Sequence, residues 1–270
     1  MRTDRDILLT NDDGIDSSGL RSLAETLSSV GSVTVVAPQS NQSAVGRSMT
    51  ERVRVEETEL GYAVDGTPSD CVVAGVRTLL DSVDLVVSGV NVGANLGEYA
   101  LGRSGTISAA VEASFFDVPA IAVSLYIPAS SDDRDAGDSI AFEDDVASAR
   151  FSEANRAVAH LTETSLDAGV FEAVDYLNVN APSPTVEPPV SMELTRPSPT
   201  YLMDAERDGA DVVLRDRIWT QMAAGDVSEP AGTDWRAVLD GKISVSPLTA
   251  THPAERHESL DVIIEDYRSA

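Results

Sequence analysis

Short runs of apolar, often β-branched residues alternate with segments of helical periodicity along the first half of the chain. Continuous apolar runs of this length are typical of strands that are buried on both faces of a parallel sheet. The alternation indicates crossover helices between the strands, and it therefore predicts an α/β fold with a mostly parallel sheet flanked by helices. The predicted strands are Ile7–Thr10, Val33–Ala37, Leu85–Ser88, Ala120–Ser124 and Tyr176–Val179.

Amphipathic helices are predicted around these strands, because apolar residues recur there at intervals of three and four. The predicted helical segments are Gly19–Ser29, Cys71–Leu80, Ile107–Ser114 and Val146–Leu166. A short antiparallel pair of strands is predicted on either side of Gly61, where apolar and polar residues alternate. The acidic stretch Asp132–Asp145 is predicted to be a solvated loop.

A proline-rich tract marks the end of this α/β core. Six of the thirteen prolines fall between Ala181 and Thr200, and we expect no regular structure there because proline fixes φ and lacks an N–H donor. The chain is accordingly divided into a core of residues 1–182, with the candidate site, and a C-terminal extension of residues 183–270. We expect the extension to serve in oligomerisation.

A β-hairpin is predicted within the extension. The Asp208-Gly209 step lies between two apolar-alternating runs, Tyr201–Glu206 and Val212–Trp219, and is a good hairpin signal. Because a two-stranded hairpin is only marginally stable, it has to pack on another element, and a partner subunit is one candidate. The remaining predicted elements are a helix capped by Thr233 or Asp234, a strand over Ile243–Ser246 and a final helix near Glu255–Tyr267.

The composition is dominated by acidic residues. Aspartate and glutamate number 45 against 19 lysine and arginine residues, which gives a formal net charge of −26, and Lys242 is the only lysine. Such a surface repels phosphate backbones and anionic lipids, so neither duplex nucleic acid nor a membrane is an expected partner. In multimolar salt the Debye length is about 3 Å or less, which screens the mutual repulsion. We interpret this surface as an adaptation to high salt.

Cysteine content and hydropathy indicate the compartment. Cys71 is the only cysteine, so no intrachain disulfide can form. The first apolar run begins after six residues, which are too few for a signal peptide, and no stretch approaches the roughly 20 apolar residues of a spanning helix. We expect a soluble, cytoplasmic protein.

Two adjacent carboxylates, Asp12 and Asp13, directly follow the first predicted strand, within Asn-Asp-Asp-Gly at 11–14. In open α/β sheets, ligands bind at the edge that the carboxyl ends of the strands form. Paired carboxylates at that edge suit a hard divalent cation. An ordinary turn is the alternative interpretation, because the same four residues are also good turn formers.

Three further segments are expected near that edge. The loop Ala37–Ser48 offers hydroxyl and amide oxygens as neutral ligands, and Val86–Gly97 combines asparagines with glycines that let a ligand approach the backbone. Gly102–Thr106 directly precedes a predicted helix, whose free N–H groups and dipole suit an anion. For the first two segments the alternative is an ordinary loop, and for the third it is an N-cap at Ser104.

These motifs follow one another in a fixed order along the chain. They are Asn-Asp-Asp-Gly at 11–14, Asn-Gln-Ser-Ala-Val-Gly at 41–46, Gly-Thr-Pro-Ser-Asp-Cys at 66–71, Val-Ser-Gly-Val-Asn-x-Gly-x-Asn-x-Gly at 87–97, Ser-Gly-Thr at 104–106 and Thr-Asp-Trp-Arg-Ala at 233–237. In this order and spacing, the chain resembles the SurE family of survival-protein nucleotidases over nearly its whole length.

The resemblance implies a metal-dependent phosphatase that acts on nucleoside 5′-monophosphates and often on 3′-monophosphates. It implies a Rossmann-like core and a C-terminal arm exchanged within a homodimer, or within a dimer of dimers. The implied ligands of one divalent ion, Mg²⁺ or Mn²⁺, per subunit are Asp12, Asp13, Ser43 and Asn91. The residues implied to lie beside the substrate phosphate are Asn95, Ser104, Gly105 and Thr106.

Asp12 is the expected catalytic residue, since it stands where it can orient or deprotonate a water activated by the metal. Two other interpretations stay open: an aspartyl-phosphate phosphotransferase with Asp12 or Asp13 as the nucleophile, and a non-catalytic nucleotide sensor. The chain departs from the family pattern at Arg47 and Arg103, where relatives often carry a histidine or an aromatic residue. No role of such a residue is transferred to these positions.

We expect the stability of the protein to depend on salt. Lowering KCl from about 1 M to about 0.1 M lengthens the Debye length from about 3 Å to about 10 Å. The acidic side chains, which give the chain a net charge of −26, then repel one another over a longer distance. The expected loss is at least about 1 kcal/mol, or roughly 2–4 °C in Tm. Thermal unfolding over a KCl series measures it, and a Tm independent of KCl would contradict the salt-adaptation interpretation.

Overall fold

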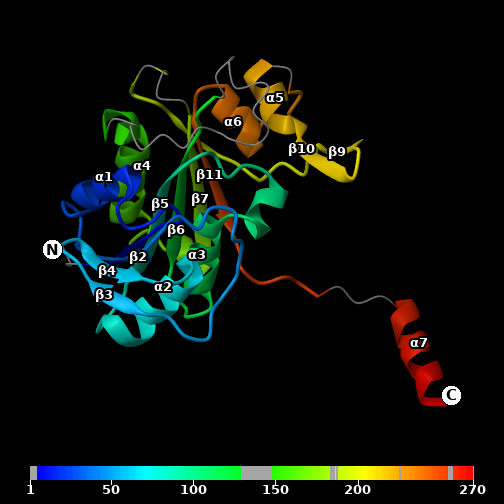
Figure 1. Cartoon of the computed structure of the whole chain (residues 1–270), viewed down its shortest axis with the longest axis horizontal. Coiled ribbons are helices and arrows are strands. Elements are labelled where there is room, and N and C mark those ends of the chain that lie inside the picture. Colours follow the sequence, from blue (N-terminus) through cyan, green and yellow to red (C-terminus); the bar gives the residue numbers. More distant parts are fainter. Residues whose placement is uncertain are drawn as a thin grey trace.

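Five parallel strands form the centre of the molecule (Figure 1). The computed structural model describes residues 5–128, 148–182, 186, 188–224, 227–254 and 258–269. The central strands lie in the order β2 (Ser32–Pro38), β1 (Asp6–Thr10), β5 (Leu85–Val92), β6 (Ala120–Leu125) and β7 (Tyr176–Ala181). Every residue of β6 and β7 is buried, as expected for central strands of a sheet that is covered on both faces.

Two further strands extend the sheet at each edge. β3 (Val55–Glu57) and β4 (Gly61–Val64) are antiparallel, as predicted around Gly61, and β4 also pairs in parallel with β2. At the other edge, β11 (Ile243–Leu248) is antiparallel to β7, and β8 (Met192–Leu194) is parallel to β11. The described residues thus form a nine-stranded sheet, and the predicted Rossmann-like, mostly parallel α/β fold is confirmed.

The proline-rich tract does contain regular structure, so the expectation for residues 181–200 is wrong. β7 continues to Ala181, and β8 lies between Pro189 and Pro197. β8 itself contains no proline, and as an edge strand it is bonded on one side only, to β11. An edge strand requires fewer backbone donors than a central one, and prolines can therefore stand close to it.

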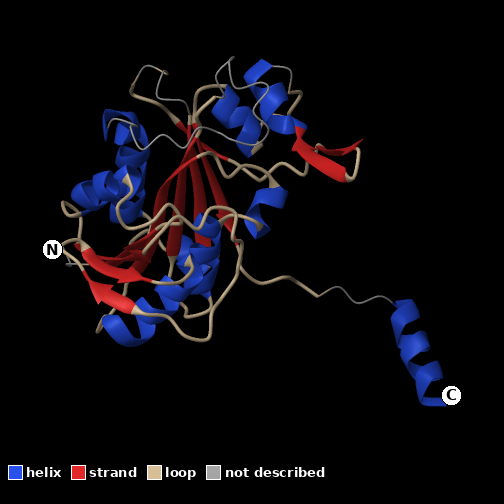
Figure 2. Cartoon of the chain, viewed as in Figure 1, coloured by secondary structure: helices blue, strands red, loops and turns tan. Residues whose placement is uncertain are grey.

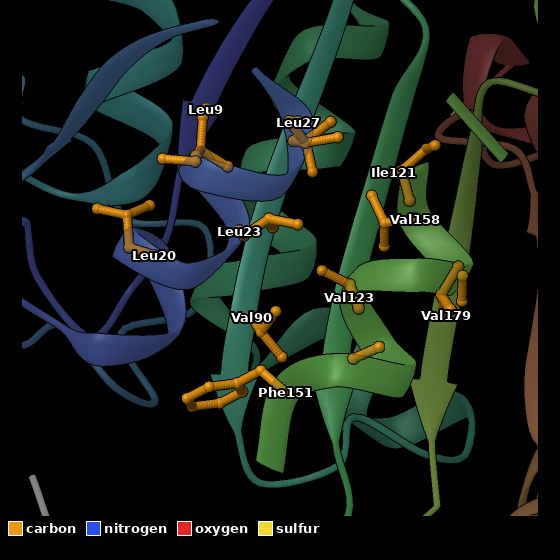
Figure 3. Packing of buried hydrophobic residues seen from close by; sticks show 14 of the residues in the cluster. Leu9, Leu20, Leu23, Leu27, Val90, Ile121, Val123, Phe151, Val158 and Val179 are labelled. Atoms are coloured by element: carbon orange, nitrogen blue, oxygen red, sulfur yellow. The ribbon is translucent and has the colours of Figure 1, made fainter. Parts of the chain in front are cut away.

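Helices cover both faces of the sheet (Figure 2). α1 (Ser18–Leu27) and α4 (Ser152–Thr164) pack on one face, and α2 (Pro68–Ala74) and α3 (Gly105–Ser114) pack on the other. Figure 3 shows the first of these interfaces, which includes Leu20, Leu23, Leu27, Val90, Phe151 and Val158. The helices predicted from apolar periodicity are therefore confirmed.

Two of these helices differ from the predicted segments by three residues or more at their N-terminal ends. α2 begins at Pro68, three residues before the segment Cys71–Leu80, and its cap is Thr67, one of the two caps, Thr67 and Ser69, that the motif at 66–71 predicts. A turn of π-helix over Gly75–Leu79 continues it. A 3₁₀ turn over Ser148–Phe151 precedes α4. The predicted acidic loop at 132–145 and the start of the next predicted helix at 146–147 lie outside the described residues.

The predicted hairpin is confirmed. β9 (Met203–Asp208) and β10 (Asp211–Asp216) pair along their whole length, and a two-residue turn joins them. Across the pair, Arg215 Nη1 lies 3.0 Å from Glu206 Oε2. Figure 1 shows the hairpin beside α5 and α6, away from the centre of the sheet.

The expectation that the second hairpin strand reaches Trp219 is wrong. α5 (Arg217–Ala224) begins directly after the strand, and Asp216 Oδ1 accepts a hydrogen bond from the Ile218 N–H at 3.1 Å. Ile218 and Met222 are both buried and stand four residues apart, which is the spacing of a helix face rather than of a strand.

α5 and α6 (Asp234–Leu239) pack together in a third apolar cluster. Thr233 rather than Asp234 caps α6, since its hydroxyl accepts a hydrogen bond from the Arg236 N–H. Trp235 is fully buried in this cluster, together with Ile218 and Leu96. Leu96 belongs to the loop after β5, so the cluster joins the C-terminal extension to the sheet edge where the candidate site lies.

α7 (Glu258–Ser269) lies apart from the sheet, at the end of the extended segment that follows β11 (Figure 1). The predicted final helix is confirmed from residue 258 onward, and residues 255–257 lie outside the described ranges. In the described part of the chain, no helix has both the length and the apolarity to cross a membrane. The division at residue 182 and the use of the extension in oligomerisation stay predictions.

Candidate active site

A tight turn follows β1 and carries the two candidate carboxylates. The side chain of Asn11 closes this turn, because its Nδ2 donates to the Gly14 carbonyl at 3.0 Å and its Oδ1 accepts from the Gly14 N–H at 3.2 Å. Gly14 has a φ of +104°, which favours glycine. The turn interpretation of Asn-Asp-Asp-Gly is therefore correct, and the turn is also what presents Asp12 and Asp13.

The carboxylate of Asp12 lies at the N-terminus of α3. The Thr106 hydroxyl donates to Asp12 Oδ1 at 2.7 Å, and the backbone N–H groups of Gly105 and Thr106 also bind this carboxylate. A Cβ atom on Gly105 would stand 2.7 Å from Asp12 Cβ, so only glycine fits there. The positive end of the helix dipole favours a negative charge at this position.

Asp13 lies beside it, is partly buried and has fewer donors. The Val92 N–H binds its carboxylate, while the buried Oδ2 has no hydrogen-bond partner among the described residues. Burial, and then the charge of Asp12, raises the pKa of Asp13 to about 7, and burial raises the pKa of Asp12 as well. Such a pair must hold a proton or a cation, because two buried like charges repel one another.

The loops after β2 and β5 meet at the same turn. The Gln42 N–H donates to the Asp12 carbonyl at 2.6 Å, which brings the exposed Ser43 next to the turn. Asn91 is buried one residue before Val92, and its Nδ2 donates to the Gly93 carbonyl at 2.6 Å, so its oxygen end is the one left for a cation. The structure thus gathers at one edge the segments that carry all four predicted ligands.

The donor set at this edge fits a hard divalent cation. Two carboxylates, a hydroxyl and a side-chain amide are oxygen donors of the kind that Mg²⁺ and Mn²⁺ prefer. Among the described residues there is no group of three or more His, Cys, Asp or Glu side chains that could hold a metal. A cation at Asp12 and Asp13 would therefore depend on neutral oxygens as well.

Asn95 lies further along the edge and is bound to β6 and β7. Its N–H donates to Asn180 Oδ1 at 2.8 Å, and its Nδ2 donates to Ser124 Oγ at 2.9 Å. The Asn95 carbonyl accepts from the side-chain amides of Asn178 and Asn180. Sequence reasoning missed these three partners, although polar residues inside an apolar buried strand, as at 178 and 180, are a usable signal.

The Ser104-Gly105-Thr106 turn has a structural role. Ser104 Oγ accepts from the Ile107 N–H at 3.2 Å, so the N-cap interpretation is confirmed. The N–H groups of Gly105 and Thr106 already serve the Asp12 carboxylate. Binding of a substrate phosphate at these residues and at Asn95 stays a prediction.

The two arginines that depart from the family pattern contact aromatic rings. The Arg47 guanidinium lies 5.4 Å from the ring centre of Phe115, which follows the C-terminal end of α3. Arg103 directly precedes the N-cap Ser104 and lies 5.5 Å from the ring centres of both Tyr99 and Tyr201. The two arginines therefore contact opposite ends of the region around α3.

Asp234 is a second residue that sequence reasoning missed, since it considered this residue only as a helix cap. Its carboxylate is fully buried and accepts hydrogen bonds from the N–H groups of Gly97 at 2.7 Å, Ser198 at 3.0 Å and Trp235 at 2.8 Å. Burial raises its pKa to about 6. The bond to Gly97 fixes the loop that carries Asn95, which is two residues away.

Comparison with known proteins gives a consistent result. The family model described as survival protein SurE matches residues 7–203. Proteins named 5′-nucleotidase SurE from the halophilic archaea Haloarcula marismortui and Natronomonas pharaonis are 59% and 54% identical to the chain. Each alignment covers 97% of this chain, and they cover 94% and 100% of the respective relatives. Their source agrees with the interpretation of the acidic surface.

A solved structure is similar over almost the whole chain. The crystal structure of the SurE protein from Aquifex aeolicus matches with a TM-score of 0.70 at 30% identity. The match covers 98% of this chain and 100% of that one.

We expect the stability of the cation-free protein to depend on pH through Asp13. For the cation-free protein, Asp13 has a pKa of about 7 when folded against 3.8 in the unfolded chain. The folded state therefore binds more protons between about pH 4 and pH 7, and stability falls as the pH rises through that window. Asp13→Asn should remove the part of this fall in the free energy of unfolding that the titration of Asp13 causes. The measurement is the free energy of unfolding against pH, in chelator and molar KCl.

At pH 8, Mn²⁺ at a hundredfold excess over its Kd adds about 2.7 kcal/mol to the wild type, which is roughly 5–10 °C in Tm. We expect Asp13→Asn to lose most of this gain. Asp16→Asn is the matched control, since Asp16 is exposed on the same loop and pairs with Arg21, and it should keep the gain. An equal gain in Asp13→Asn and the wild type would show that the cation binds elsewhere.

Proposed function

The chain belongs to the SurE family, and from this premise we propose that it is a phosphatase that hydrolyses nucleoside 5′-monophosphates to nucleoside and phosphate. The proposal includes one divalent cation, Mg²⁺ or Mn²⁺, per subunit, and it extends to nucleoside 3′-monophosphates as further substrates. Relatives at 54% to 59% identity carry the name 5′-nucleotidase, which supports this class of phosphoric monoester hydrolase.

The observation that carries the proposal is that the buried Asp12 and the partly buried Asp13 lie side by side at the sheet edge. Asp13 Oδ2 is buried without a hydrogen-bond partner among the described residues. A buried polar atom in this situation costs free energy unless a ligand satisfies it. A cation that neutralises both carboxylates would remove that cost and their repulsion together.

In the proposal, Asp12, Asp13, Ser43 and Asn91 hold the cation. When bound, a divalent cation polarises a phosphoryl oxygen and lowers the pKa of a bound water. Support comes from the segments that carry these four residues, because the loops after β1, β2 and β5 are joined by the bonds from Gln42 to Asp12 and from Val92 to Asp13.

Asp12 also acts on the attacking water in the proposal. The Thr106 hydroxyl holds Asp12 Oδ1, so Oδ2 is the oxygen assigned to accept the proton from the water. Burial raises the pKa of Asp12, and the donors from the start of α3 act in the opposite direction; the bound cation would also favour the ionised carboxylate, which is the form that a general base requires. Thr106 is therefore a positioning residue for Asp12.

The substrate phosphate is assigned to the start of α3 and to Asn95. The N–H groups of Gly105 and Thr106 already bind Asp12, but the positive end of the α3 dipole also favours a second negative charge nearby. The support is the closeness of the Ser104-Gly105-Thr106 turn to the Asp12 carboxylate. A phosphate bound beside this turn would lie next to the assigned base.

Two other functions predict different results. An aspartyl-phosphate mechanism at Asp12 or Asp13 predicts a phosphoprotein that acid quenching traps. A nucleotide sensor predicts tight nucleotide binding without phosphate release. The test is phosphate release from a panel of nucleoside 5′- and 3′-monophosphates in molar KCl, with Mn²⁺ or Mg²⁺ and with a chelator control. We expect release that the chelator abolishes, and no trapped phosphoprotein.

Asp12→Asn should lower kcat by at least about a hundredfold, the usual loss for a general base, while its circular dichroism spectrum stays that of the wild type. Asp16→Asn makes the same chemical change four residues away on an exposed side chain and should leave kcat unchanged. Cation-dependent release by Asp12→Asn at the wild-type rate would refute the assignment of Asp12.

We further propose that the chain forms a homodimer, or a dimer of dimers, through its C-terminal extension. α7 lies apart from the sheet with a row of apolar side chains at helical spacing, which are Leu260, Ile263, Ile264 and Tyr267. Each of them is at least 52% exposed, and contiguous exposed apolar surface is typical of an interaction site. β10 adds the exposed Val212 and Leu214.

Light scattering after size exclusion in molar KCl tests this proposal. The expected mass is two or four times that of the 28.5 kDa chain. Ile263→Asp puts a charge in the centre of the apolar row and should shift the population towards smaller species, whereas Thr251→Asp, on the exposed segment before α7, should not. A monomeric wild type would overturn the proposal.

A further inference from the structure

Tyr99, Arg103 and Tyr201 form a cluster of two aromatic rings and a cation. The ring centres of the two tyrosines lie 5.6 Å apart with their planes tilted by 56°. The Arg103 guanidinium lies 5.5 Å from each ring centre, and its Nη2 donates to the Tyr201 hydroxyl at 3.0 Å. The cluster joins the segment before α3 to the segment before the hairpin.

Arg103 connects this cluster to the proposed catalytic site. It directly precedes Ser104, the N-cap of α3, and its carbonyl accepts a hydrogen bond from the Gly46 N–H at 3.2 Å. Its backbone is therefore fixed between the loop that carries Ser43 and the turn assigned to the phosphate. A nucleotide whose phosphate lies at that turn has its nucleoside within reach of the cluster.

Tyr99 and Tyr201 differ in burial and in hydrogen bonding. Tyr99 lies in a 3₁₀ turn over Glu98–Gly102, is partly buried and donates its hydroxyl to Asp216. Tyr201 is 52% exposed, so part of its ring is open to a ligand. Tyr99 is thus a fixed support, and Tyr201 is the ring that a flat ligand can contact.

In the described part of the chain, the positive charge of the Arg103 guanidinium stays uncompensated, although the whole chain has a net charge of −26. Other arginines, such as Arg21 and Arg215, form ion pairs with carboxylates on the surface. Within the described residues, Arg103 contacts the two rings and a neutral hydroxyl, and none of the ion pairs includes it. A guanidinium without a carboxylate partner keeps its attraction for an anionic ligand.

We propose that Tyr99, Arg103 and Tyr201 form the nucleobase-binding surface of this site, with the base stacked on the exposed ring of Tyr201. This inference rests on the proposed nucleotidase function. Every nucleobase has a π face, and stacking on an aromatic side chain is tolerant of base identity. The cluster therefore gives preference for nucleotides over phosphate esters that lack a base, and little discrimination among bases.

The test compares adenosine 5′-monophosphate with ribose 5-phosphate, which carries the same phosphate and sugar without a base. Tyr201→Ala should lower kcat/KM for the nucleotide about tenfold or more, through KM rather than kcat, and should leave ribose 5-phosphate unchanged. Tyr201→Phe keeps the ring and should stay within about twofold of the wild type on both substrates. Tm values in molar KCl establish that the variants are folded.

Phe115→Ala is the matched control. Phe115 is 54% exposed and, like Tyr201, lies under an arginine, but it stands at the far end of α3. This variant should leave kcat/KM for both substrates unchanged.

Three outcomes would overturn the inference. They are an equal loss on both substrates in Tyr201→Ala, no loss on either, and a wild type with the same kcat/KM for both. The last outcome would leave the phosphatase function intact and reject only the nucleobase surface. A folded, cation-loaded wild type that releases phosphate from neither substrate would reject the proposed function and this inference together.

Discussion

Two carboxylates that are consecutive in the chain, the buried Asp12 and the partly buried Asp13, lie beside one another at the end of β1, and their repulsion has to be offset for the chain to fold. The N-terminus of α3 offsets part of it through the Thr106 hydroxyl and two backbone N–H groups, all of which bind Asp12. Asp13 keeps an unsatisfied buried oxygen. Stability alone would not select this pair, so its presence indicates a function that requires it.

The residues around Asp12 and Asp13 leave room for the two side chains and fix the loops beside them. Gly105 leaves room for the Asp12 side chain, and the turn closed by Asn11 and Gly14 aims both carboxylates at the sheet edge. Asp234, from the C-terminal extension, fixes the loop after β5 through Gly97. The extension therefore stabilises the edge of the core on which the site depends, in addition to any role between subunits.

The parallel strands and the hairpin can be predicted from the sequence, because burial on both faces requires continuous apolar runs and a tight turn requires Asp-Gly. α5 is harder to predict, because the apolar run that favours a strand extends into it, whereas the bond from Ile218 to Asp216 and the four-residue spacing of the buried Ile218 and Met222 favour a helix. At the site, the position of Asp12 after a strand is a local signal. Its bond to Thr106 spans 94 residues, and that of Asp234 to Gly97 spans 137, so no local pattern predicts either.

The central claim is that Asp12 and Asp13 lie side by side, with Asp12 buried and Asp13 partly buried, in order to hold a cation beside the start of α3. The most direct test is a crystal structure of the protein soaked in Mn²⁺, with anomalous diffraction to locate the ion. The account predicts one strong anomalous peak per subunit, bonded to carboxylate oxygens of both Asp12 and Asp13, with the bond from Thr106 to Asp12 retained. An Mn²⁺ peak elsewhere, with Asp13 Oδ2 still unsatisfied, would contradict it.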